Sequence, residues 1–203
     1  MSPNFLIEED LISGGYPIIA GVDEVGRGPL AGPVTAAAVI LNPLNIPDQL
    51  DDSKVLSVKK REEFYEELKS SCTFAVAHVS PKEIDKLNIL QASLLAMVNA
   101  VSKLDLTPNH ILIDGNKIPE RLAGQATAVV KGDRKVLSIA AASIIAKVTR
   151  DKLMHDLGSE FPVYGWAKNA GYPTKCHMNA IVKYGVTPHH RRSFKPVHNI
   201  LCG

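Results

Sequence analysis

Ile-Ile-Ala-Gly-Val-Asp-Glu-Val-Gly-Arg-Gly-Pro-Leu-Ala-Gly-Pro, residues 18–33, is the most informative segment of the sequence. Its apolar start, 18–22, predicts a buried strand. The strand delivers two carboxylates, Asp23 and Glu24, which need a cation, a proton or a polar partner if they are buried. Because neighbouring side chains on a strand point to opposite faces, we expect the strand to bend or end at this pair, so that both carboxylates share one site.

A Gly-Arg-Gly turn, Gly26-Arg27-Gly28, follows the two carboxylates. Glycine adopts conformations that other residues avoid and lets the backbone approach a ligand closely. An arginine framed by two glycines suits recognition of an anion or a sugar better than packing in a core. The Asp-Glu pair alone would more often be a strand end followed by a solvated acidic turn, but the adjoining glycine-rich segment favours a functional site.

The composition is ordinary for a soluble globular protein, with 203 residues, 45% hydrophobic and 22% charged. The net charge of +2 is too small to identify a nucleic-acid partner, so such a surface must come from local clusters of Lys and Arg. The three cysteines lack metal-ligand spacing and fit a reducing compartment. The sequence shows neither a signal-peptide core nor an apolar run that could span a bilayer. We therefore expect a cytoplasmic protein with no membrane association.

Alternating strand and helix patterns predict an α/β layer architecture. Strands are expected at residues 18–22, 34–41, 74–79, 111–113 and 126–130, with the first two as an antiparallel pair. Helices are expected at residues 58–70, 81–104, 136–149 and 175–184, the second opened by a capping box with proline at its first position. The alanines of the third helix predict close packing on a sheet.

Three segments are expected along the chain. Residues 1–16 carry little pattern and predict an N-terminal arm, either loose or a short helical turn. Residues 17–160 hold the strands and long helices of a catalytic core. From residue 161 the sequence becomes aromatic, basic and punctuated by Gly and Pro, which indicates a small helical and basic C-terminal appendage that completes the substrate site, residues 161–203.

Three predicted strands end in carboxylates: Asp23 with Glu24, Asp114 and Asp133. Ligands gather at strand ends in open α/β sheets, so these side chains are expected to converge. Oxygen ligands without His or Cys suit Mg²⁺ or Mn²⁺, and two such ions about 3.5–4 Å apart can activate water and stabilise the leaving oxygen of a phosphodiester. Taken singly, Asp114 also suits a turn and Asp133 a helix terminus, while Asp151 is interpreted as a solvated helical residue.

The chain resembles the type 2 ribonucleases H, the bacterial ribonuclease HII family, from residue 18 to residue 197. Several separate segments agree in order: Asp23 to Gly28, Asp52-Ser53-Lys54, Leu112 to Gly115, Lys131-Gly132-Asp133, Ser138 to Val148, Gly171-Tyr172-Pro173-Thr174 and His190 to Phe194. The resemblance implies a ribonuclease-H-like fold, with a central mixed five-stranded sheet flanked by helices and a small helical C-terminal appendage. The metal-binding carboxylates that it implies are Asp23, Glu24, Asp114 and Asp133.

The resemblance also implies an activity. It indicates an endoribonuclease that hydrolyses the RNA strand of RNA–DNA hybrids and incises duplex DNA at single embedded ribonucleotides, leaving 5′-phosphate and 3′-hydroxyl ends. Two other interpretations stay open. A DNA nuclease or integrase on the same fold would ignore the 2′-hydroxyl, and a non-catalytic hybrid-binding module would normally have lost a carboxylate. A monomer is expected, and a replication or repair partner cannot be identified from the sequence.

Recognition of the 2′-hydroxyl distinguishes RNA from DNA. Backbone N–H and C=O groups suit a hydroxyl, and the resemblance assigns this role to Gly26, Arg27 and Gly28. By resemblance Tyr172 packs on the neighbouring sugar, although a half-buried loop tyrosine is the alternative. Further substrate contacts are expected from the basic and hydroxyl side chains Lys54, Lys147, Arg191, Arg192, Ser138 and Ser143, of which Ser138 equally suits a helix cap. Asn169 and Ala170 stand where many relatives carry basic residues.

Overall fold

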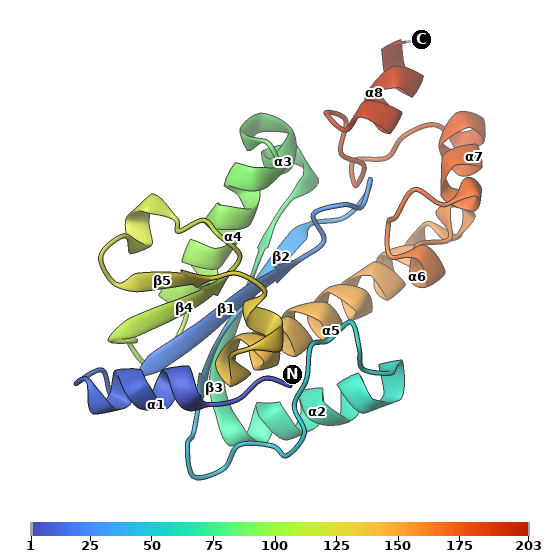
Figure 1. The fold of residues 1–203 in the computed structure, drawn as a ribbon. Coiled ribbons are helices and arrows are strands. Elements are labelled where there is room, and N and C mark those ends of the chain that lie inside the picture. Colours follow the sequence, from blue (N-terminus) through green and yellow to red (C-terminus); the bar gives the residue numbers. More distant parts are fainter. Residues whose placement is uncertain (1, 203) are drawn as a thin grey trace.

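The computed structural model describes residues 2–202 as a five-stranded mixed sheet with helices on both faces (Figure 1). The strands are β1 (Ile19–Val25), β2 (Val34–Leu41), β3 (Cys72–Val79), β4 (His110–Asp114) and β5 (Ala126–Val129). Their order across the sheet is β3-β2-β1-β4-β5. β2 is antiparallel to both β1 and β3, whereas β4 is parallel to both β1 and β5. The predicted mixed sheet and the antiparallel first pair are confirmed.

The described part of the chain contains eight α-helices. They are α1 (Leu6–Ser13), α2 (Val58–Ser71), α3 (Pro81–Leu87), α4 (Ile89–Ser102), α5 (Leu137–Glu160), α6 (Trp166–Asn169), α7 (Lys175–Tyr184) and α8 (Lys195–Cys202). Short 3₁₀ turns are η1 (Glu120–Leu122), η2 (Gly132–Arg134) and η3 (Pro162–Tyr164). Between residues 2 and 202, no helix combines the length and apolar character needed to cross a membrane.

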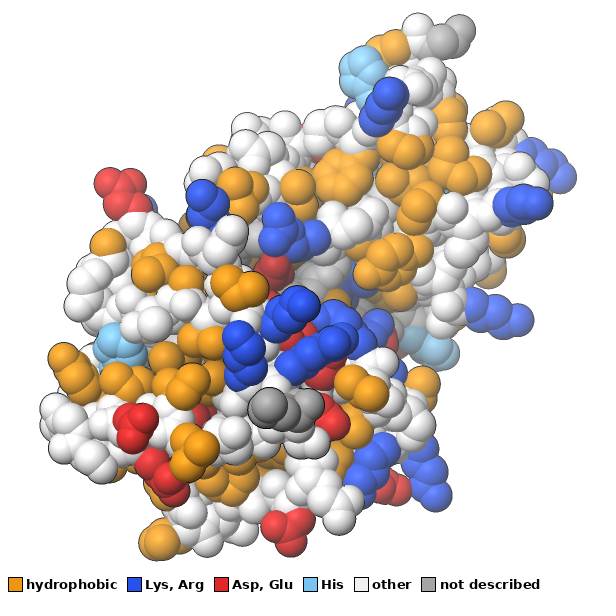
Figure 2. Space-filling view, in the orientation of Figure 1, with side chains coloured by type: hydrophobic (Ala, Val, Ile, Leu, Met, Phe, Trp, Pro, Cys, Tyr) orange, Lys and Arg blue, Asp and Glu red, His pale blue; other side chains and the backbone are white. Residues whose placement is uncertain are grey.

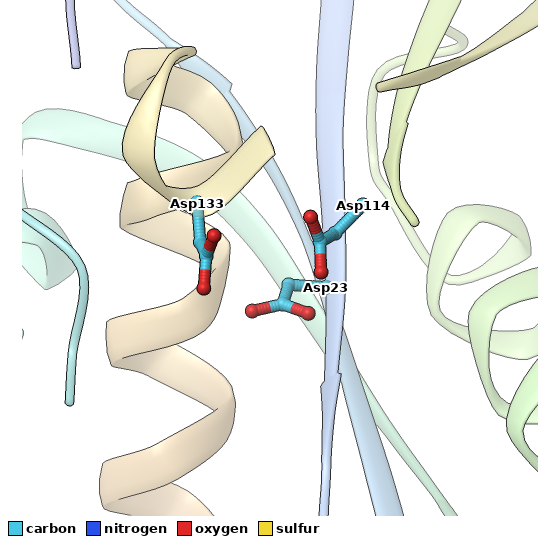
Figure 3. A group of neighbouring side chains, drawn as sticks. All are labelled: Asp23, Asp114 and Asp133. Atoms are coloured by element: carbon cyan, nitrogen blue, oxygen red, sulfur yellow. The ribbon is translucent and has the colours of Figure 1, made fainter. Parts of the chain in front are cut away.

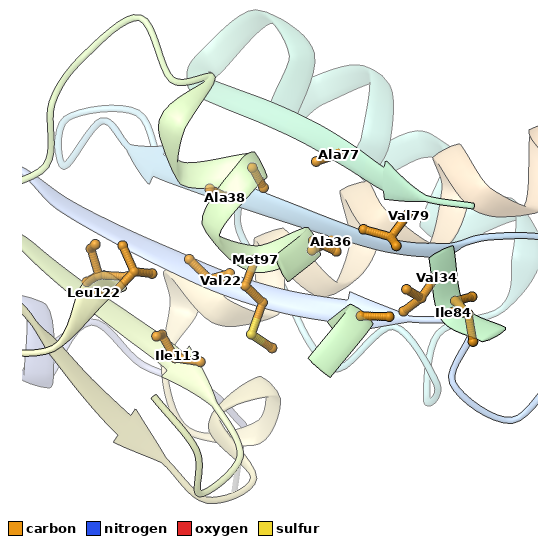
Figure 4. Packing of buried hydrophobic residues seen from close by; sticks show 14 residues of the cluster. Val22, Val34, Ala36, Ala38, Ala77, Val79, Ile84, Met97, Ile113 and Leu122 are labelled. Atoms are coloured by element: carbon orange, nitrogen blue, oxygen red, sulfur yellow. The ribbon is translucent and has the colours of Figure 1, made fainter. Parts of the chain in front are cut away.

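The two faces of β2 show how the sheet is covered. Ala36 and Ala38 pack with α3 and α4 (Figure 4), while Ala37 and Val39 pack with α2 and α5. Such alternation is what a strand buried on both sides requires. A methyl group on Gly21 would collide with the backbone of Ser138, so α5 lies against β1 at backbone contact distance. The predicted close packing of the alanine-rich helix on the sheet is confirmed.

The helix expected over residues 81–104 is divided in two. Asn88 has a φ of 70° and ends α3, and its side chain accepts a hydrogen bond from the backbone N–H of Gln91 at the start of α4. Asparagine tolerates this left-handed region better than most residues and is a good N-cap. The capping box of Ser80 and Glu83 is present as predicted. The predicted continuous helix is therefore wrong at one residue, where a cap interrupts it.

The N-terminal segment is not loose in the described residues. Helix α1 packs Ile7, Leu11 and Ile12 against an apolar cluster under β1 and α5. The buried carboxylate of Glu8 accepts a hydrogen bond of 2.9 Å from the backbone N–H of Ser138. Glu8 thus satisfies a free N–H in the first turn of α5, a favourable place for an acid. Of the two expected forms, the helical one is found, and it is anchored to the core.

The end of the chain packs onto the far end of α5 (Figure 1). Helix α5 runs to Glu160, beyond the predicted end at residue 149. Trp166, Tyr164 and Ile181 pack with Met154 of α5 and with Leu30 of the loop after β1. This contact joins the C-terminal helices to the segment after the first carboxylates. The three-part division stays a prediction, and its end residues 1 and 203 lie outside the described residues.

Candidate active site

Three aspartates bring their carboxylates together at the sheet, within 4.8 Å of one another (Figure 3). Asp23 and Asp114 meet because β1 and β4 are parallel neighbours, with Val22 paired to Ile113 one residue earlier. Asp133 arrives from η2, just before α5. The backbone N–H of Gly132 donates to Asp114 Oδ1 at 2.7 Å and fixes η2 against β4. We call Asp23, Asp114 and Asp133 the aspartate group.

The electrostatics of the aspartate group favour a cation. Burial, followed by the charges of Glu24 and Asp114, raises the pKa of Asp23 well above its usual value. Burial and the charge of Asp133 raise the pKa of Asp114. Buried oxygen donors that repel one another, with no His or Cys in the cluster, suit a hard ion such as Mg²⁺ or Mn²⁺. The residues present therefore fit a divalent metal.

Glu24 lies outside the aspartate group. β1 continues through Asp23 and Glu24 to Val25, so the predicted bend or strand end at this pair is wrong. Alternation along the strand then turns Glu24 to the face opposite Asp23. Its Oε1 accepts a hydrogen bond from Arg27 Nη1 at 3.1 Å. Burial and the charge of Asp114 raise the pKa of Glu24 against the effect of Arg27, which shows that the carboxylate is still within the field of the group.

Lys54 reaches the aspartate group from the loop before α2. Its Nζ donates to Asp133 Oδ2 at 2.7 Å and lies 3.8 Å from Asp52 Oδ1. Asp52 is fully buried and also accepts from Arg134 Nε at 3.1 Å. Burial alone would lower the pKa of Lys54, but the hydrogen bond to Asp133 and the nearby carboxylates raise it. The predicted segment Asp52-Ser53-Lys54 thus brings the Lys54 ammonium to Asp133, and the ion pair of Asp52 with Arg134 anchors the segment.

The Gly-Arg-Gly turn (residues 26–28) and Tyr172 lie side by side although 144 positions separate Gly28 from Tyr172 in the sequence. A Cβ atom on Gly28 would lie 3.4 Å from Cε1 of the Tyr172 ring. The backbone N–H of Leu30 donates to the carbonyl of Gly171 at 2.8 Å. Tyr172 is 44% exposed, so part of this side chain beside the turn is accessible.

Three residues predicted to touch substrate are buried. Ser138 lies at the start of α5, where its backbone N–H donates to Glu8 of α1 and its hydroxyl has no hydrogen-bond partner among the described residues. The hydroxyl of Ser143 is bonded to that of Ser53 at 2.6 Å. Arg191 is completely buried and donates to backbone carbonyls. Direct substrate contact by Ser138, Ser143 and Arg191 stays a prediction, and all three side chains are buried in this structure.

The remaining basic residues stay accessible. Lys147 Nζ pairs with Asp151 at 2.8 Å and borders a groove of about 510 Å³ between α2, α5 and α6. Arg192 is exposed and borders a separate hollow with Lys82 and Lys86 of α3. Asp151 is thus paired on a helix and stands apart from the aspartate group. Contacts of Lys147 and Arg192 with a phosphate remain predictions.

One buried residue near the site, Arg150, was not predicted from the sequence. Arg150 on α5 is fully buried and donates to carbonyls of the segment after β1. In sequence it is one basic residue among several on a long helix. Whether such a residue points to water or to the core depends on tertiary packing, and a local pattern does not carry this information.

Comparison with known proteins gives a consistent result. A family model described as Ribonuclease HII matches residues 20–197. A ribonuclease HII of Ruegeria sp. (strain TM1040) is 58% identical over 199 residues, which are 98% of this chain and 87% of that protein. The ribonuclease HII of Paracoccus denitrificans (strain Pd 1222) is 55% identical over 200 residues, covering 98% of this chain and 95% of that protein.

Solved structures agree with the sequence relatives. The ribonuclease H2 from Pyrococcus horikoshii OT3 matches with a TM-score of 0.77 and 30% identity, over 90% of this chain and 96% of that one. RNase HII in a PCNA complex from Archaeoglobus fulgidus matches with a TM-score of 0.74 and 29% identity, over 88% and 95% of the two chains. Bst-RNase HIII in complex with Mn²⁺ has a TM-score of 0.74 at 18% identity, over 91% of this chain and 69% of that one, a likeness of fold alone. The ribonuclease-H-like fold is confirmed.

Proposed function

The chain belongs to the ribonuclease HII family, and we propose that it incises duplex DNA at single embedded ribonucleotides as well as cleaving longer RNA–DNA hybrids. As a member of the family it is a ribonuclease H, a hydrolase that acts on the phosphodiester bonds of the RNA strand. The observation that supports the proposed site is the convergence of the buried aspartate group beside the Gly-Arg-Gly turn and Tyr172.

Enzymes of this family use divalent metal ions, and the proposed holders here are Asp23, Asp114 and Asp133, with Glu24 beside them. Two Mg²⁺ or Mn²⁺ ions would supply activation of water and stabilisation of the leaving 3′-oxygen, giving 5′-phosphate and 3′-hydroxyl ends. The chain contributes fixed oxygen donors: Asp23 and Asp114 stand on neighbouring strands, and Gly132 orients Asp114. Lys54 is hydrogen-bonded to Asp133, and its ammonium group would compensate the negative charge of a scissile phosphate.

We propose that the Gly-Arg-Gly turn and Tyr172 read the sugar. A 2′-hydroxyl both donates and accepts, and backbone groups of the turn suit it because two of the three residues lack side chains. The exposed ring of Tyr172 offers a flat apolar face to the next sugar, favouring one without a 2′-hydroxyl. Together these contacts would select an RNA-to-DNA junction. The side-by-side placement of Gly28 and Tyr172 supports this proposal.

Basic side chains would hold the duplex without reading its sequence. Figure 2 shows Lys and Arg gathered near the middle of one face, around acidic side chains. Lys54 at the aspartate group, Lys147 on α5 and Arg192 near the C-terminus are the proposed phosphate contacts. All the proposed site residues come from one chain, so we propose that the enzyme acts as a monomer.

The test is cleavage of a labelled DNA duplex that carries one ribonucleotide, beside an all-DNA duplex of the same sequence. The wild type and Asp23→Asn are assayed with Mg²⁺, with Mn²⁺ and with a chelator. We expect metal-dependent cutting at the ribonucleotide only, lost in Asp23→Asn. Equal cutting of both duplexes would favour a DNA nuclease, and binding of a hybrid without cutting would leave a hybrid-binding module.

A further inference from the structure

Two arginines, Arg150 on α5 and Arg191 before α8, are fully buried without a carboxylate partner. Both side chains are 0% exposed, and neither forms a salt bridge within residues 2–202. Burial lowers the pKa of Arg150 to about 10 and, with the charge of Arg150, lowers that of Arg191 to about 9, so both are charged at neutral pH. A buried charge is costly unless its hydrogen bonds are satisfied.

Within residues 2–202, the hydrogen bonds of the two guanidinium groups all go to backbone carbonyls. Arg191 donates to the carbonyls of Gly32 at 3.0 Å, Arg27 at 3.0 Å and Gly26 at 2.6 Å. Arg150 donates to the carbonyls of Pro33 at 2.9 Å, Ala170 at 3.0 Å and Ala31 at 3.2 Å. Five of the six acceptors belong to residues 26–33, and the sixth, Ala170, belongs to the turn that carries Tyr172.

The two arginines therefore connect two segments that are far apart in sequence. Arg191 holds the Gly-Arg-Gly turn by two of its three carbonyls, and Arg150 joins the end of the same segment to the turn of residues 170–172. Two backbone bonds reinforce the connection, from Leu30 to Gly171 and from Arg191 to Leu30, each of 2.8 Å. The result is one hydrogen-bonded unit that contains both proposed sugar-reading elements.

Two glycines of residues 26–33 lie directly against the side chain of Arg150. Gly26 has a φ of +91°, and a methyl group there would collide with the guanidinium of Arg150. Gly32, with a φ of +82°, leaves room for Met154 and Arg150. Gly28 differs, because the only neighbour of a Cβ atom there is the ring of Tyr172. Gly26 and Gly32 thus leave room for the buried side chain of Arg150, whereas Gly28 lies beside Tyr172 on the proposed substrate side.

We propose that Arg150 and Arg191 are positioning residues that set the distance between the Gly-Arg-Gly turn and Tyr172, and so determine the preference for a ribonucleotide. This inference rests on the proposed sugar-reading role of those two elements. Only guanidinium suits the arrangement, since its planar fork reaches three carbonyls at once, whereas the ammonium of lysine is a point charge. A displacement of about 1 Å at such a site can cost about 100-fold in rate.

The experiment compares Arg191→Lys and Arg150→Lys with wild type, and Arg121→Lys on the exposed turn η1 serves as the matched control. Fluorescence anisotropy in the presence of chelator gives the affinity for a duplex with one ribonucleotide and for the all-DNA duplex. Calorimetry without nucleic acid gives the affinity for Mn²⁺. Hydrogen exchange reports the protection of residues 26–33 and 170–172.

We expect each lysine variant to lower the ribonucleotide preference about tenfold, the order of one well-placed hydrogen-bond contact. The Mn²⁺ affinity should stay within about twofold of wild type. Hydrogen exchange should accelerate in residues 26–33 and 170–172, and this acceleration can be measured even if a variant has low stability. Arg121→Lys should match wild type. A preference retained by both lysine variants, or protection of both segments unchanged, would overturn the positioning role alone. A wild type with no preference would instead contradict the proposed function on which the inference rests.

Discussion

At the scale of single residues, the aspartate group suits metal binding but destabilises the folded chain when no metal is bound. Asp23 is 4% exposed, and burial together with its acidic neighbours makes its ionised form unfavourable. The folded chain without metal therefore binds more protons at this residue than the unfolded chain does. Protonation of Asp23 therefore stabilises the folded chain. This contribution is complete below the ordinary pKa of an aspartate and is lost as the pH rises through the raised pKa of Asp23.

Asp23→Asn should stabilise the metal-free protein at neutral pH. The change removes a buried charge that repels two carboxylates, and we expect a gain of about 0.5–2 kcal/mol at pH 7.5, the usual size of a stabilising substitution. The gain should shrink toward pH 4, where Asp23 is protonated in the wild type. Urea unfolding in chelator at both pH values measures it. An equal or lower stability of Asp23→Asn at pH 7.5 would contradict the electrostatic reasoning.

The glycines of the Gly-Arg-Gly turn should respond differently to alanine. Gly26→Ala places a methyl group in a left-handed conformation against Arg150, so we expect a loss of about 1–3 kcal/mol of stability. Gly28→Ala only touches Tyr172, and its stability should stay within about 0.5 kcal/mol of wild type. Because that methyl group enters the proposed sugar site, cleavage at a single ribonucleotide should fall about 10–100-fold. A fully active Gly28→Ala enzyme would argue against the proposed role of the turn.

At the scale of elements, a histidine pair ties α7 to the Tyr172 turn. The backbone N–H of Thr187 donates to His190 Nδ1 at 2.9 Å, so the hydrogen of neutral His190 is on Nε2, 3.2 Å from His177 Nε2. His177 Nε2 also accepts from Trp166 Nε1 at 3.0 Å, which leaves its Nδ1–H for the carbonyl of Tyr172 at 2.9 Å. With both histidines neutral, every ring nitrogen has a hydrogen-bond partner.

This pair predicts an acid-sensitive C-terminal region. Burial and then the charge of His177 lower the pKa of His190 from 6.5 to about 4. The neutral form of His190 is favoured in the folded chain, so the stability that it contributes is complete above pH 6.5. About 2–3 kcal/mol of this stability is lost as the pH falls toward 4. Unfolding followed by the fluorescence of Trp166, the single tryptophan, should show a smaller loss in His190→Gln than in wild type.

The exposed His155 gives the control for that measurement. His155→Gln should lose stability with pH as the wild type does, because its ring is already in water when folded. If His190→Gln and wild type lost the same stability between pH 6.5 and pH 4, the buried pair would not be the source of the acid sensitivity.

The elements also show where local pattern suffices. The capping box of Ser80 and Glu83 and the bounds of β2 and α7 follow from short-range signals in the sequence. The break at Asn88 was missed because the apolar spacing continues through it, while a cap is decided by one residue. The course of β1 past Asp23 and Glu24 was missed because pairing with β2 extends the strand, and a polar dipeptide does not reveal this pairing.

At the scale of the whole molecule, the sequence predicted the sheet and the meeting of the aspartates better than the surroundings of the site. Parallel neighbours bring their ends together, so acids after strands could be placed without coordinates. The side on which Glu24 lies and the burial of Arg191 depend on how distant segments pack. Arg191 was expected to contact a phosphate, whereas the arginine pair is buried and donates to six carbonyl acceptors from two distant segments.

The salt dependence of duplex binding should separate surface cations from buried ones. Lys147→Ala and Arg192→Ala remove proposed phosphate contacts, so each should weaken binding and reduce the slope of log K against log salt by about one. Arg191→Lys should leave this slope unchanged, since residue 191 faces carbonyls. Anisotropy titrations between low and moderate salt give the slopes. Unchanged slopes in both alanine variants would remove Lys147 and Arg192 from the interface.

Mn²⁺ binding to the aspartate group is the most direct test, measured by calorimetry on the protein without nucleic acid. Asp114→Asn removes one donor, and Asp151→Asn removes the same charge from a helical residue outside the group. We expect binding that strengthens from pH 5.5 to pH 7.5, because protons must leave the carboxylates. Asp114→Asn should weaken it at least about tenfold, as loss of a ligand or of its support does, while Asp151→Asn should match wild type. Equal affinity in Asp114→Asn and wild type would contradict a metal site at the aspartate group.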